Sequence, residues 1–166
     1  MTSKDIYFRL KPPELTPKDE ICKCKNTPPV KLMYALSYNP VHSINCNLEV
    51  PPETLGMSEE LAQEISFWRW IYSSVDHLWL ASGEYEAWAE KELADISSSI
   101  NQKGREAQIG LNLVRRSYYW YFQNQSEDDF TPITNCPVCG EVLVKYSGGI
   151  FEQLICENCS IITVGD

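Results

Sequence analysis

The sequence predicts an α+β fold built from three consecutive regions. Residues 1–56 are rich in Pro and Cys and contain one strand-like run. Residues 57–124 follow a helical periodicity that ends in an aromatic strand, and residues 130–166 hold paired cysteines around a hairpin-like segment. An apolar fraction of 43% in 166 residues is enough for a hydrophobic core, so we expect a folded body with a small appended module.

The first region is divided by three Pro-Pro pairs, which exclude long helices there. Between them, residues 30–38 (VKLMYALSY) have the β-branched and aromatic composition of a strand. This run is the strand expected in residues 1–56.

The cysteines of the first region predict a metal site. Cys22 and Cys24 precede the expected strand and Cys46 follows it, so folding can bring three thiols together. With His42 or Glu49 as a fourth ligand, this group would bind zinc. The alternative is that the cysteines are small buried apolar residues and that His42 is an ordinary loop histidine.

A long helix is expected to open the second region. From Ser58 to about Trp79 the apolar residues recur in steps of three and four. Ser58 is a suitable N-cap, and the two glutamates that follow it favour the first turn. Phe67 and Trp70 add apolar surface on another side, so we expect this helix to be central in the core.

Two shorter helices and a strand are expected next. The second helix runs from about residue 84 to Gly104, and the third covers residues 105–114. Residues 117–123 (SYYWYFQ) are aromatic enough for a strand. The polar residues 124–129 then form a linker, which we expect to separate the core of the last region from that of the helical body.

The last region carries the most specific chemical pattern of the chain. Cys136 and Cys139 form one CxxC pair, and after sixteen further residues Cys156 and Cys159 form a second. Two residues between cysteines allow a tight turn to direct both sulfur atoms at one tetrahedral ion. The pattern predicts a zinc ribbon with a β-hairpin between the pairs, and two disulfides or four free thiols are the alternatives. Four thiolates leave no open coordination position, so the ion would build structure and perform no catalysis.

The net charge of −9 is unevenly distributed and restricts the partners. Residues 51–100 hold ten Asp or Glu against Arg69 and Lys91. Nucleic acid is disfavoured as the principal ligand because phosphate binding requires a basic face. The acidic residues form either a solvated helix face or a surface for a basic protein partner.

Location and chemical class follow from what the sequence lacks. It has no segment typical of an export signal or a membrane span, and an odd number of cysteines, seven, suits a reducing compartment. A cytoplasmic protein is therefore predicted. The sequence also lacks a phosphate-binding loop and the GxSxG and HExxH motifs, so we do not expect an enzyme. The oligomeric state is left open.

Taken together, these features resemble a bacterial family of zinc-ribbon-containing proteins of unknown function that are described as potential nucleic-acid-binding proteins. The resemblance covers most of the chain and rests on Cys22-x-Cys24, Ser43-Ile-Asn-Cys46, Trp70, Tyr72, Asp76, Trp79, Gly104-Arg105, Tyr118-Tyr-Trp-Tyr and the two terminal CxxC pairs. It implies zinc binding and contact with nucleic acid. In that family the first region carries a CxC and a CxxC, and the last of these positions is Glu49 here.

Two functions are compatible with the sequence. In the first, a non-enzymatic zinc-binding protein acts by protein-protein interaction, most concretely as an acidic immunity protein that neutralises a basic nuclease-like toxin. In the second, the zinc ribbon and Arg105, Arg115 and Arg116 contact nucleic acid or a transcription complex.

Overall fold

The computed structural model describes residues 16–26, 28–126 and 128–165, and within these ranges the predicted α+β class is confirmed. The described helices are a short 3₁₀ helix η2 (Pro52–Thr54), α1 (Glu59–Ala81), α2 (Glu86–Ala94) and α3 (Ser99–Val114). The described strands are β1 (Val30–Leu32), β2 (Val41–Ser43), β3 (Ser117–Trp120), β4 (Val144–Lys145), β5 (Gln153–Cys156) and β6 (Ile161–Val164). None of the helices in these ranges combines the length and the hydropathy of a membrane span.

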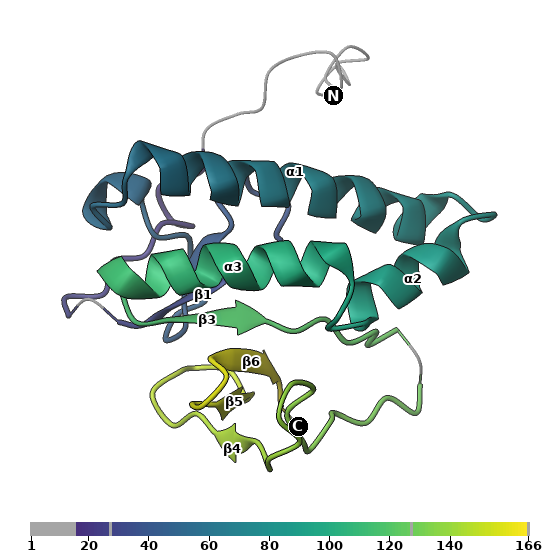
Figure 1. The fold of residues 1–166 in the computed structure, drawn as a ribbon. Coiled ribbons are helices and arrows are strands. Elements are labelled where there is room, and N and C mark those ends of the chain that lie inside the picture. Colours follow the sequence, from purple (N-terminus) through teal and green to yellow (C-terminus); the bar gives the residue numbers. More distant parts are fainter. Residues whose placement is uncertain (1–15, 27, 127, 166) are drawn as a thin grey trace, which may run out of the picture.

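One sheet passes through all three predicted regions, in the order β2-β1-β3-β6-β5-β4 (Figure 1). β1 is antiparallel to β2 and parallel to β3, β3 is parallel to β6, and β6, β5 and β4 are antiparallel neighbours. At the junction Tyr119 lies opposite Ile161 and Trp120 lies opposite Ile162. The expectation of a separate C-terminal core is therefore wrong, because β6 satisfies the backbone groups that β3 would otherwise leave unpaired.

The helices cover one face of this sheet. Figure 1 shows α1 and α3 side by side above β1 and β3, with β4, β5 and β6 extending the sheet away from them. The core between these layers contains Trp68, Tyr72, Leu93, Leu111 and Tyr119. The C-terminal Cys136, Leu143, Cys156 and Ile161 belong to the same apolar cluster. One core thus spans the helical body and the last region.

Helix α1 begins where the sequence predicts. The Ser58 hydroxyl accepts a hydrogen bond from the Leu61 N–H at 3.2 Å, as an N-cap does. The expectation of burial on two sides is wrong, because only one side of α1 faces the sheet and α3. Phe67 and Trp70 are 52% and 67% exposed.

The break between α2 and α3 lies earlier than expected. Ser98 caps α3, and the buried Asn101 amide donates to the carbonyls of Leu93 and Asp95 at the end of α2. Gly104 lies inside α3, where an added Cβ would come within 2.4 Å of the Tyr119 ring. This glycine therefore allows close packing of α3 on β3 and does not end a helix.

The first expected strand is shorter than its composition suggests. After β1 the chain leaves the sheet, and Tyr34 stacks on Tyr72 of α1 with ring centroids 5.2 Å apart. β3 likewise ends at Trp120. Aromatic residues favour strands and also loops that pack on helices, so composition did not fix these ends.

Candidate metal centres

Four thiols meet at the C-terminal end of the fold. The sulfur atoms of Cys136, Cys139, Cys156 and Cys159 all lie within 4.8 Å of one another, and Cys139 Sγ is 3.7 Å from Cys156 Sγ. Two sulfur atoms bound to one tetrahedral zinc ion are separated by about 3.8 Å, whereas disulfide sulfurs are about 2.05 Å apart. All four cysteines are free. The four-thiol group can therefore hold a metal ion.

In each CxxC turn, a backbone N–H donates a hydrogen bond to the first sulfur atom of the pair. The Val138 N–H donates to Cys136 Sγ at 3.5 Å, and the Cys159 N–H donates to Cys156 Sγ at 3.4 Å. Burial opposes ionisation of Cys136, but the N–H groups of Cys139 and Val138 overcome this effect and lower its pKa. Gly140, at a φ of 76°, supplies the left-handed residue that closes the first turn.

The same crowding opposes the ionisation of the two cysteines of the second CxxC pair. Burial, together with the nearby Cys136 and Cys139, raises the pKa of Cys156 and of Cys159. A divalent ion would remove this penalty and displace the thiol protons, so its affinity must rise with pH until the thiols are ionised. Cys136 and Cys156 are buried in the shared core, so a bound ion would stabilise that core directly.

A second group contains three thiols. The sulfur atoms of Cys22, Cys24 and Cys46 lie within 4.8 Å of one another, and the Cys46 thiol is 3.5 Å from Cys22 Sγ. The Cys22 N–H donates to the Glu49 carbonyl at 2.8 Å, which fixes the N-terminal segment beside the turn after β2. The hydrogen bond with Cys22 raises the pKa of Cys24 to about 11, so a metal ion that binds here would have to displace the proton of Cys24.

The structure does not bring either expected fourth ligand to the three-thiol group. The His42 Nδ1 atom lies 3.2 Å from the Asn47 carbonyl and Nε2 lies 3.4 Å from Ser37 Oγ. Glu49 accepts a hydrogen bond from the Thr16 hydroxyl at 2.6 Å. Neither side chain belongs to the group within 4.8 Å. The reason is positional, because His42 lies on β2 while Cys46 lies in the turn that follows it.

A comparison with known protein families found one family model that matches this chain. The model of a family described as Domain of unknown function (DUF2310) matches residues 26–123, more than half of the sequence. The chain belongs to the DUF2310 family. No curated protein and no solved structure shows a significant match.

The DUF2310 match runs from just before β1 to just after β3, so it contains all three α-helices. Cys46 lies inside the matched range, whereas Cys22, Cys24 and the four-thiol group lie outside it. The family description gives no function, and no family match covers the predicted zinc ribbon. The evidence for a ribbon is therefore the spacing and the geometry of its four cysteines.

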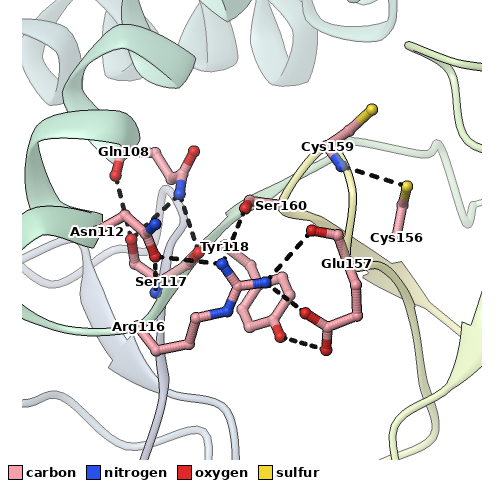
Figure 2. A network of polar contacts seen from close by, with 9 residues as sticks. All are labelled: Gln108, Asn112, Arg116, Ser117, Tyr118, Cys156, Glu157, Cys159 and Ser160. Atoms are coloured by element: carbon pink, nitrogen blue, oxygen red, sulfur yellow. Dashed lines mark hydrogen bonds and ion pairs between the residues drawn. The ribbon is translucent and has the colours of Figure 1, made fainter.

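A polar network joins the second CxxC turn of this DUF2310 chain to its body (Figure 2). Glu157, between Cys156 and Cys159, forms an ion pair with Arg116 and accepts a hydrogen bond from the Tyr118 hydroxyl at 2.7 Å. Arg116 also donates to Ser160 Oγ at 3.2 Å, and its guanidinium lies 4.6 Å from the Tyr118 ring centroid. One cation that the sequence offered for nucleic-acid contact is thus already paired.

Sequence reasoning missed a buried cation. Lys31 on β1 is 2% exposed, its ammonium donates to Gln153 Oε1 at 2.9 Å, and it lies 4.4 Å from the Trp120 ring centroid. Burial lowers the pKa of Lys31 to about 7, and the charge of Cys46 acts in the opposite direction. The sequence of β1 does not indicate this burial, because Gln153, which accepts the hydrogen bond of Lys31, lies 122 positions further along the chain. Trp120, the ring beside the ammonium, is also distant in the sequence.

Proposed function

We propose that this protein is a non-enzymatic zinc-binding protein that acts by binding a basic protein partner. The observation that carries the proposal is an acidic, aromatic face of α1 turned away from the core. We define the acidic aromatic face as Glu59, Glu60, Glu64, Phe67 and Trp70. All five side chains are exposed.

Zinc suits the four-thiol group because soft thiolates in a tetrahedral arrangement select this ion in proteins. Four protein ligands leave no position for a substrate, so the ion's role is to hold β5 and the two CxxC turns against the shared core. The metal ion and the helices therefore have different roles. The metal ion stabilises the fold, and the exposed face of α1 binds the partner.

The acidic aromatic face has the chemistry of a docking surface. The rings of Phe67 and Trp70 have centroids 6.5 Å apart, and together with Glu59 and Glu64 they line a shallow hollow along α1. Exposed Trp is enriched among residues that dominate binding energy, and surrounding carboxylates steer and select a basic partner. A nuclease-like toxin is one such partner because its substrate cleft is positive, and an immunity protein would block that cleft.

The test compares two exposed tryptophans on different helices. Three proteins serve as bait in the native host: wild type, Trp70→Ala and Trp88→Ala. The last is the control, because it removes a half-exposed Trp of α2. We expect a basic protein that is captured by wild type and by Trp88→Ala and is lost with Trp70→Ala. With the purified partner, Trp70→Ala should weaken binding by about 2 kcal/mol or more, and Glu64→Lys should mainly slow association.

Two outcomes would overturn the docking proposal. One is capture of the same proteins by all three baits. The other is sub-micromolar binding of single-stranded or duplex nucleic acid that survives moderate salt, because an acidic surface cannot gain affinity from phosphate contacts.

A further inference from the structure

The three-thiol group differs from a closed metal site in the number of donors that the chain supplies. Among residues 16–26, 28–126 and 128–165, no other Cys, His, Asp or Glu joins Cys22, Cys24 and Cys46 within 4.8 Å. His42 and Glu49 are engaged elsewhere by hydrogen bonds to Asn47 and Thr16. Zinc with thiolate ligands is almost always four-coordinate, so three thiolates leave one position to fill.

The group is also accessible. Cys24 is exposed, and Cys22 and Cys46 are half-buried. In the four-thiol group, by contrast, Cys136 and Cys156 are buried in the core. A ligand from solvent can therefore approach the three-thiol group without opening the core.

The charge around the group favours an anionic fourth ligand. Lys31 is a buried ammonium that donates to the neutral amide of Gln153, and the same amide donates to the carbonyl of Ile44, two residues before Cys46. A divalent ion with three thiolates carries a net charge of −1, and a fourth thiolate would make it −2. A nearby buried ammonium offsets this added charge, whereas a neutral ligand would gain nothing from it.

We propose that Cys22, Cys24 and Cys46 bind one zinc ion whose fourth ligand is an exchangeable thiolate from outside the chain. The inference rests on the zinc binding stated under the proposed function and extends it by naming the class of ligand. The incoming thiol loses its proton to solvent as its sulfur binds the ion, and no electron is transferred. The sulfur comes from a small cellular thiol or from a cysteine of the protein partner.

Cobalt substitution tests the inference on the full chain. Metal-free protein is loaded with two equivalents of Co²⁺, and thiolate-to-cobalt absorption is followed while 2-mercaptoethanol is added. Because seven chain thiolates become eight in total, the band should rise by about one seventh and then saturate. Cys46→Ser should abolish this rise and retain the spectrum of the four-thiol group.

The same assay separates the two sources of thiol. Glutathione carries a net negative charge, whereas the tripeptide Lys-Cys-Lys with blocked ends presents a cysteine in a basic context. A lower saturating concentration for glutathione assigns the ligand to a small thiol. A lower one for the basic peptide assigns it to a protein partner, since the chain is acidic.

Several results would overturn the inference. The first is the absence of any rise in absorption when thiol is added, and the second is a rise that persists in Cys46→Ser. The third is a change in the spectrum recorded without thiol in Glu49→Gln, in His42→Gln or in the double variant Asp5→Asn, Glu14→Gln. Such a change would show that the chain supplies the fourth donor. If the four-thiol spectrum forms and thiol has no effect, only this inference fails. If no cobalt or zinc binds at all, the proposed zinc binding fails with it.

Discussion

The two thiol groups of this protein are built from the same kind of side chain but differ in donor number and in burial. The four-thiol group takes its ligands from two CxxC turns, each with an N–H aimed at its first sulfur, and two of its cysteines lie in the core. The three-thiol group takes its ligands from an N-terminal segment and a turn after β2, and it lies partly open to solvent. We therefore propose that donor number and burial, more than donor type, separate a metal ion with a closed set of ligands from one whose fourth ligand exchanges.

The groups are nevertheless connected through one hairpin. β5 ends at Cys156 of the four-thiol group. The tip between β4 and β5 reaches the turn that carries Cys46, where the Tyr146 hydroxyl donates to Asn45 Oδ1 at 2.7 Å and the Ile150 N–H donates to the Asn45 carbonyl at 2.9 Å. Metal at either group should therefore stabilise a segment that the other group contacts.

The largest effect should come from the four-thiol group. Cys139→Ser removes an exposed ligand, so it tests the metal with little change in packing. We expect zinc affinity at this group to fall by more than about 100-fold, because even partners of ligands contribute 10- to 100-fold. Since β6 pairs with β3, the helical body should lose stability too, seen as a lower midpoint of the helical circular-dichroism signal.

Cys24→Ser is the matched control, since it removes an exposed ligand of the three-thiol group. It should cost one equivalent of zinc and lower the midpoint less than Cys139→Ser does, because none of the three thiols is fully buried in the shared core. A helical midpoint unaffected by Cys139→Ser would show that the last region is energetically separate from the body in spite of the shared sheet.

Lys31→Met should produce opposite effects on stability and on metal binding. Burial lowers the pKa of Lys31 to about 7 from its usual value of about 10.4, so the cost of its buried charge is fully present below pH 7 and disappears as pH rises toward 10.4. Below pH 7 the metal-free variant should therefore be more stable than metal-free wild type by about 1–4 kcal/mol in urea unfolding. The difference should shrink between pH 7 and 10.

Zinc affinity at the three-thiol group should move the other way, because the variant lacks the cation that offsets thiolate charge. Chelator competition measures this loss. Equal zinc affinity in wild type and Lys31→Met would show that the charge of Lys31 does not contribute to metal binding at the three-thiol group.

Tyr146→Phe tests the connection between the groups. It deletes one hydrogen bond to Asn45, worth about 1 kcal/mol, and leaves every cysteine in place. Zinc affinity at the three-thiol group should fall by up to about fivefold, with the four-thiol group unchanged. A similar loss at both groups would indicate general destabilisation of the hairpin.

The smallest effect is expected for Glu157→Gln. The carboxylate pairs with Arg116 at a partly exposed position, so its loss should cost only about 0.5 kcal/mol of stability. Zinc release from the four-thiol group to a chelator should become modestly faster, because the second CxxC turn loses one contact with the body. No change in release would show that the turn is positioned by the metal and backbone alone.

The sequence by itself determined the features that depend on neighbouring residues. Ser58 caps α1 because an N-cap needs only its own hydroxyl and the next turn of helix. The two CxxC pairs specify their N–H contacts to sulfur in the same local way. The acidic composition of residues 51–100 likewise follows from the sequence alone.

Only the tertiary structure decided how distant segments meet. The burial of Lys31 depends on Gln153 and Trp120, the pairing of β6 with β3 joins the last region to the body, and His42 is held by Asn47 away from the thiols. Spacing along a strand gives the side on which a residue lies. It does not give which strand lies next to it or what covers that side, because those are set by contacts between residues far apart in the chain.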